Sequence, residues 1–192
     1  NLLIKNKIKE IKKPIFICGF PRSGTTALLG VLNSHEDTGS FLYKDLPFIK
    51  TLFFWNLINN LYYKGVQVRL RYHGDGIEIT PESPDAFEEL IWRDFIIDYE
   101  KSGFFKLLSK DYNNNQFKKF LCEQIKKILY IRGNKTRYLS KGNYNIFRVD
   151  YIKKIFPDAK IIICFRDPIE SAISSVNVHN NFLSLSKNNK YF

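Results

Sequence analysis

The sequence predicts an α/β fold in which a parallel sheet, with a P-loop-like turn after its first strand, is flanked by helices. Three observations lead to this prediction. Residues 14–18 form a short apolar run that enters a glycine-containing loop and then a helical pattern. A second apolar run, residues 160–165, has the composition of a parallel strand buried on both faces, and Pro168 suits the first turn of the helix after it. Strand-like and helix-like patterns alternate between the two runs.

The remaining elements follow from periodicity and from helix-capping signals. Residues 48–63 are aromatic and apolar almost all round, so we expect a helix that is deeply packed or lines an acceptor cleft, with Pro47 at its start. Ser83 and Pro84 resemble an N-cap and a first helical position. The expected elements, in chain order, are a peripheral arm (1–13), strand 15–18, helix 25–34, helix 48–63, an irregular segment (65–80), helix 83–99, helix 117–131, strand 137–140, helix 144–156, strand 160–165 and a helix from 168.

Composition restricts the class of protein. A chain of 192 residues suits one domain, spanning residues 1–192, and can bury a real core. The formal net charge of +11 comes from lysines scattered along a chain that is also rich in Asn and Ile. We therefore expect the charge to favour a small anionic ligand, and we do not expect nucleic acid as a partner.

Three cysteines without CxxC spacing predict buried free thiols and a reducing compartment, so we expect a cytoplasmic protein. No apolar run approaches the ~20 residues of a membrane-spanning helix, and no signal peptide is visible. The alternative is the Golgi lumen, if a membrane anchor has been removed. The chain begins at Asn1 and contains no Met, and its last residues resemble a cut, so we expect part of a longer protein.

The first loop has the pattern of an anion-binding turn. It reads Gly19-x-x-x-x-Gly24-Thr25-Thr26 and opens a helix whose first N–H groups lack partners inside the helix. Thr25 occupies the position at which nucleotide-triphosphate loops carry lysine, and the cation is Arg22 instead. The loop should therefore bind a phosphate-like group without the lysine that reaches the outer phosphates of ATP or GTP.

A second candidate site follows the strand at 160–165. Arg166 lies at the carboxyl end of that strand, and Ser174 follows eight residues later, about two helical turns into the next helix. Both side chains could therefore face one phosphate.

Together the two motifs resemble the sulfotransferases that use 3′-phosphoadenosine 5′-phosphosulfate (PAPS), and most closely the bacterial and Golgi-type members with Arg in the first loop. The resemblance implies the sulfotransferase fold, with further helices after the second motif that this chain lacks. It implies that Arg166 and Ser174 hold the 3′-phosphate. It also implies that the 5′-phosphosulfate is held by Arg22, Ser23, Gly24, Thr25 and Thr26.

The implied activity is transfer of a sulfuryl group from PAPS to a hydroxyl of a saccharide, tyrosine or other acceptor, with release of PAP. No metal is required, and the sequence shows no cluster of metal ligands. Lys141 resembles the lysine of the family's Lys-x-Pro segment, which stabilises the departing charge, although Asn143 replaces the proline. Arg22 and Lys141 are therefore the expected catalytic cations.

The general base is left open among three residues. Related enzymes carry a Glu a little over twenty residues after the loop cation, whereas this window holds Tyr43, Lys44 and Asp45. Asp45 is our first candidate, His73 the second because imidazole titrates near neutrality, and Asp75 the third. Four aromatic residues could wall the acceptor site or belong to the core: Trp55, Tyr62, Tyr63 and Trp92.

Two other functions stay open at this point. One is a P-loop kinase or NTPase, which the Thr25 substitution disfavours. The other is a non-catalytic PAP-binding module that lacks a base. The sequence does not identify the acceptor or the oligomeric state.

Overall fold

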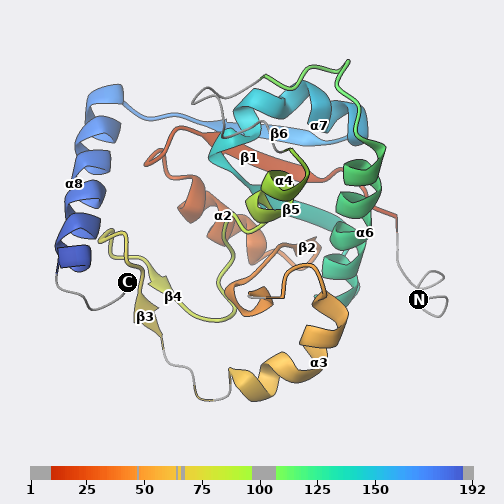
Figure 1. The fold of residues 1–192 in the computed structure, drawn as a ribbon, viewed down its shortest axis with the longest axis horizontal. Coiled ribbons are helices and arrows are strands. Elements are labelled where there is room, and N and C mark those ends of the chain that lie inside the picture. Colours follow the sequence, from red (N-terminus) through yellow and green to blue (C-terminus); the bar gives the residue numbers. More distant parts are fainter. Residues whose placement is uncertain (1–9, 47, 64, 66–67, 97–106, 188–192) are drawn as a thin grey trace.

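The computed structural model describes residues 10–46, 48–63, 65, 68–96 and 107–187, and it confirms the α/β fold (Figure 1). A four-stranded parallel sheet has the order β2-β5-β1-β6, and a separate antiparallel pair is formed by β3 and β4. The strands are β1 (Ile15–Gly19), β2 (Thr38–Gly39), β3 (Arg69–Leu70), β4 (Glu78–Ile79), β5 (Arg137–Lys141) and β6 (Lys160–Cys164).

The helices cover the central strand β1, all five residues of which are buried. Phe16 joins a large core with residues of the helices on one face, while Ile15 and Ile17 pack with Leu29 and Leu139 on the other. This division follows from the alternation of side chains along a strand. The helices are α2 (Thr25–Asn33), α3 (Leu52–Tyr62), α4 (Glu89–Phe95), α6 (Asn115–Ile131), α7 (Val149–Ile155) and α8 (Pro168–Lys187), with 3₁₀ turns η1 (Tyr43–Asp45) and η2 (Asn143–Arg148).

The register of the sheet brings the ends of three strands together. Ile17 of β1 is level with Lys141 of β5, and Gly19 is level with Cys164 of β6. In parallel strands the carboxyl ends lie at one edge, so the loop after β1, Lys141 and the residues after β6 share that edge. Open α/β sheets bind their ligands there.

The prediction that β6 is buried on both faces is wrong. β6 is an edge strand, and Ile163 is 55% exposed. The helix that follows, α8, buries none of its residues and lies on the opposite side of the molecule from α6 (Figure 1). The apolar run indicated a strand correctly, but it did not indicate the strand's place in the sheet.

The helix predicted from residue 83 begins six residues later, at Glu89. Residues 80–85 instead run beside the segment before η1: Tyr43 N–H donates to the Ser83 carbonyl at 3.0 Å, and Leu42 forms a bridge with Pro84. These contacts compete with the helical conformation and leave Asp85 outside the helix. The predicted end of this helix near residue 99 lies outside the described residues.

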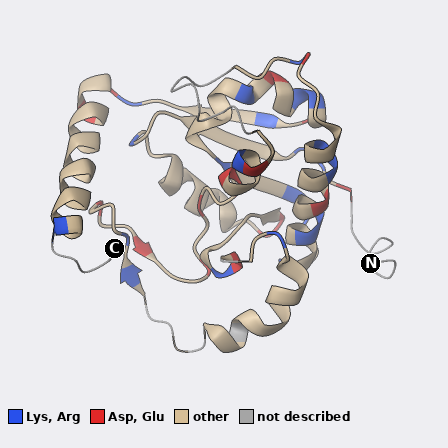
Figure 2. Ribbon diagram, viewed as in Figure 1, with Lys and Arg blue, Asp and Glu red and all other residues tan. Residues whose placement is uncertain are grey.

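Other boundaries differ in smaller ways. The helix expected over 48–63 is α3, which starts at Leu52, and Pro47 lies outside the described residues. Only one face of α3 is packed, because Leu52 and Trp55 are buried while Phe54 and Leu57 are each 78% exposed. The helix expected over 144–156 is divided into η2 and α7. Lys side chains recur along α6 and α7, whereas α3 and most of α8 carry no charge (Figure 2).

Candidate active site

The loop after β1 has a backbone that requires glycine. A Cβ on Gly19 would lie 2.2 Å from the Cys164 carbonyl oxygen of β6, so the loop can leave the sheet only without a side chain there. Gly24, immediately before α2, has φ of 86°, a conformation that glycine adopts at no steric cost. Arg22 also has a positive φ, 69°. A non-glycine residue held in this region is strained and is found frequently at functional sites.

The start of α2 is suited to an anion. Within the described part of the chain, Gly24 gives the helix no side-chain cap, so the first N–H groups of α2 are not satisfied by a capping side chain. These groups and the helix dipole favour negative charge at this end. The Thr26 hydroxyl accepts a bond of 3.4 Å from Arg71, so a second cation lies beside the turn.

Arg22 joins the two sequence motifs, which lie far apart in the chain. Its Nε donates to the Ser174 hydroxyl of α8 at 2.9 Å. Arg166, the other residue expected at the 3′-phosphate, binds Glu170 at 2.6 Å, and its side chain is 48% exposed. The structure thus places the loop and α8 in contact through Arg22, with Arg166 at the start of the segment that leads to α8.

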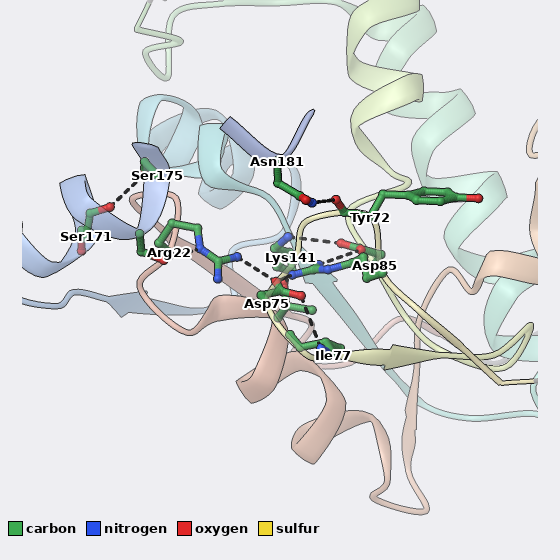
Figure 3. Close-up of polar contacts among 12 residues, drawn as sticks. Arg22, Tyr72, Asp75, Ile77, Asp85, Lys141, Ser171, Ser175 and Asn181 are labelled. Carbon is green, nitrogen blue, oxygen red and sulfur yellow. Dashed lines mark hydrogen bonds and ion pairs between the residues drawn. The ribbon is translucent and has the colours of Figure 1, made fainter. Parts of the chain in front are cut away.

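A chain of alternating charges extends from Arg22 along the edge of the sheet (Figure 3). Asp75 accepts from Arg22 at 2.8 Å and also from Arg71, which bonds to Asp85 at 3.4 Å. Lys141 donates to Asp85 at 3.2 Å. We call these five residues the charge chain. Sequence reasoning missed Arg71 and Asp85, since the first lies in a segment expected to be irregular and the second resembled an acid in a helical first turn.

Both carboxylates of the charge chain have lowered pKa values. Burial raises the pKa of Asp75, but the hydrogen bonds from Arg71 and Arg22 outweigh burial and hold it below its ordinary value. Burial likewise raises the pKa of Asp85, and the Lys141 charge, the Ala86 N–H and Arg71 together lower it by more. Both groups are therefore ionised at neutral pH.

This arrangement predicts a loss of stability in acid. The folded-state pKa of Asp75 lies below the ordinary value of 3.8, so the unfolded chain takes up its proton first as the pH falls. The contribution of Asp75 is fully present above that value and declines below it. Urea unfolding at about pH 5 and about pH 3.5 should show a smaller pH dependence for Asp75→Asn than for the wild type. An unchanged pH dependence would contradict the assignment.

Asp45, the first candidate for the base, has a different partner. It is 1% exposed and accepts from Arg132 through both oxygens, one bond measuring 2.6 Å, and from the Leu42 N–H at 2.7 Å. Burial raises its pKa, and Arg132 opposes the rise. The contacts leave little room for an acceptor hydroxyl and fix the backbone of η1.

His73, the second candidate, faces α8. Its ring makes an edge contact with Phe182, at 5.4 Å between centroids, and Asn181 donates to the Tyr72 carbonyl beside it at 2.7 Å. Burial and the Arg71 charge lower the pKa of His73, so the imidazole is neutral at physiological pH. Its Nδ1 is buried without a hydrogen-bond partner among the described residues.

The aromatic residues divide between core and surface. Trp92 is 2% exposed and belongs to the main core, and the Trp55 indole donates to the Lys44 carbonyl at 2.6 Å. Tyr62 is 68% exposed. Tyr63, in contrast, lines a cavity of about 360 Å³ together with Tyr43. That cavity opens beside η1 and the β3–β4 pair.

Comparisons with known proteins show the family and the fold. A profile of the sulfotransferase family matches residues 14–191. The crystal structure of the sulfotransferase STF9 from Mycobacterium avium is similar over 96% of this chain, with a TM-score of 0.56 and 17% identity. The crystal structure of the sulfotransferase STF1 from Mycobacterium tuberculosis H37Rv is similar over 86% of this chain, with a TM-score of 0.48 and 15% identity. A protein of Aquifex aeolicus described as uncharacterized is 26% identical over 181 residues, or 93% of the chain.

The chain therefore belongs to the sulfotransferase family. It spans 50% of the M. avium chain, 48% of the M. tuberculosis chain and 18% of the Aquifex protein. Helices within the described ranges are all too short or too polar to cross a membrane. The same ranges contain no group of three or more His, Cys, Asp or Glu side chains arranged to hold a metal ion.

Proposed function

We propose that this protein transfers a sulfuryl group from PAPS to a hydroxyl of an acceptor and releases PAP. The observation that carries the proposal is the bond from Arg22 to Ser174, since it joins the anion-binding loop to the helix of the second motif. In this proposal the 5′-phosphosulfate is held by Arg22, Ser23, Gly24, Thr25 and Thr26. Arg166 and Ser174 bind the 3′-phosphate.

The structure is compatible with such a donor substrate. The loop offers N–H groups at the start of α2, and two guanidinium groups, Arg22 and Arg71, flank it. Lys141 lies at the end of β5, the neighbour of β1, with a side chain only 10% exposed. Bound PAPS supplies an electron-poor sulfuryl group with PAP as leaving group. The cations then stabilise the negative charge that grows on the leaving oxygens. Catalysis of this kind depends on positioning and electrostatics and does not require a metal.

The acceptor is proposed as a class only: a hydroxyl of a saccharide, a tyrosine or another small or polymeric compound. The described cysteines are free thiols, which fits a reducing compartment such as the cytoplasm.

Calorimetric titration with PAP and AMP, without added metal, tests the donor site. We expect PAP to bind at least about tenfold more tightly than AMP, because Arg166 and Ser174 would contact the 3′-phosphate that AMP lacks, and one such charged contact contributes about 1.5–3 kcal/mol. Arg166→Ala should weaken PAP binding while leaving AMP binding unchanged. Equal affinities for PAP and AMP would refute the proposed function, and tight magnesium-dependent binding of ATP would favour a P-loop NTPase instead.

A further inference from the structure

We propose that Asp85 is the general base that accepts the proton of the acceptor hydroxyl. This inference rests on the proposed sulfuryl transfer and names a residue for the step that sequence reasoning assigned to Asp45, His73 or Asp75. It is based on the position of the Asp85 carboxylate in the charge chain, where it contacts both Lys141 and Arg71. Figure 3 shows Asp85 beside Lys141.

The position of Asp85 follows from the topology of the sheet. Lys141 is level with Ile17 of β1, two residues before the loop begins at Gly19. Its Nζ reaches Asp85 Oδ1 at 3.2 Å, and the Ala86 N–H holds the same oxygen at 2.8 Å. On the other side, Arg71 connects Asp85 with Thr26 at the start of α2, with both bonds at 3.4 Å. Asp85 therefore contacts two cations, Lys141 and Arg71, and each of them lies beside the loop proposed to hold the sulfuryl group.

Of the three buried carboxylates Asp45, Asp75 and Asp85, Asp85 is the most accessible. Its side chain is 13% exposed, compared with 3% for Asp75 and 1% for Asp45. Asp75 is held by two guanidinium groups, and Asp45 is held through both oxygens by Arg132. The contacts on Asp85 Oδ2 are longer, at 3.2 Å from Tyr43 and 3.4 Å from Arg71. A hydroxyl could replace either of them at small cost.

Tyr43 connects Asp85 with a space that can hold an acceptor. Its hydroxyl donates to Asp85, and its ring lines the cavity of about 360 Å³ together with Tyr63, Arg69 and Thr80. Aromatic walls with a few polar groups are typical of sites for small ring compounds. Tyr43 belongs to the segment, a little over twenty residues after Arg22, in which the base was expected. That segment therefore supplies a hydrogen-bond partner of Asp85. Acceptors with an aromatic or sugar ring fit this cavity.

The proposed step transfers no electrons to or from a redox partner. As the acceptor oxygen forms a bond to sulfur, its proton passes to Oδ2 of Asp85. The bond between sulfur and the bridging oxygen of PAPS breaks, and its electron pair leaves with PAP, where Lys141 and Arg22 stabilise the charge. Asp85 then loses the proton to water. Positive neighbours keep Asp85 ionised before the step, as a base requires.

The test uses PAPS and three acceptors: phenol, the more acidic 4-nitrophenol, and water. In Asp85→Asn we expect kcat with phenol and with water to fall by about 100-fold or more, since a positioned base contributes about 10²–10⁴-fold. The loss should be much smaller with 4-nitrophenol, which ionises readily without a base. The Kd for PAP should change by less than about threefold. Asp94→Asn is the matched control, because Asp94 of α4 forms an exposed ion pair with Lys50.

A second variant guards against a merely structural effect. Asp85→Ala should regain about tenfold or more of its lost turnover with added formate, which can take the place of the missing carboxylate. An equal loss with all three acceptors and no recovery with formate would reduce Asp85 to a positioning residue and overturn the proposal. Full activity of Asp85→Asn together with an inactive His73→Ala would transfer the role to the imidazole.

The outcomes separate this inference from the proposed function. If the wild type fails to distinguish PAP from AMP, the proposed function itself fails. If PAP binds tightly but the wild type transfers nothing to phenols or water, PAP binding stands and Asp85 is not a base.

Discussion

Lys141→Ala is expected to lower kcat by about 100- to 1,000-fold while the Kd for PAP changes far less, since removing one group that stabilises transition-state charge costs about 2.7–4 kcal/mol. Lys141 is the residue of β5 level with Ile17 of β1, and its ammonium lies within the charge chain. Charge on the leaving oxygens grows only during the reaction, so the side chain should contribute little to the binding of the product. Turnover is measured with PAPS and phenol, and PAP affinity by calorimetry.

Lys50→Ala is the control for this experiment, because Lys50 forms an exposed ion pair with Asp94 away from the loop. Arg22→Ala should show the same pattern, with some additional loss of PAP affinity, since Arg22 lies in the loop itself. A normal rate in Lys141→Ala would show that Lys141 has no part in the reaction.

Asp45→Asn is expected to reduce the free energy of unfolding by about 3–5 kcal/mol, because it removes one partner of a buried ion pair and leaves Arg132 without its counter-charge. Asp45 is 1% exposed and Arg132 10% exposed, and the pair joins η1 to the end of α6. Urea unfolding at neutral pH measures the change. The double variant Asp45→Asn/Arg132→Met should recover part of the loss, since it removes the unpaired cation as well.

The same variant distinguishes a structural role from a catalytic one. At temperatures at which Asp45→Asn stays folded, we expect it to retain transfer activity. A stability loss below about 1 kcal/mol combined with complete loss of transfer would return the role of base to Asp45.

The sequence indicated the parts of the site that are contiguous in the chain. The loop from Gly19 to Thr26 could be predicted because its residue types are dictated by a tight turn before a helix, and the φ values of Arg22 and Gly24 agree with such a turn. Lys141 could be placed because parallel strands end at one edge. These features depend on local geometry and on a general rule of sheet topology.

The other half of the charge chain depends on contacts between distant segments. Arg71 meets Thr26, and Asp85 meets Lys141, only after the β3–β4 pair and residues 80–85 have folded against the sheet edge. Local sequence around Asp85 favours a helix start, and pairing with the segment before η1 overrides that preference. The edge position of β6 could not be predicted for a similar reason, since an apolar run does not specify strand order.

The carboxylate of Asp75, held between Arg22 and Arg71, has a consequence for what the site admits. It is an anion attached to the same chain, so its local concentration at the two guanidinium groups is far above that of most free solutes. A small anion such as chloride or inorganic phosphate competes with it at a disadvantage. A ligand with several charged groups, which bind the loop, Arg22 and α8 at the same time, avoids this disadvantage. Its other contacts hold it in place while one charged group displaces Asp75. Asp75 therefore acts as an internal competitor that favours ligands with several charged groups over ligands with one.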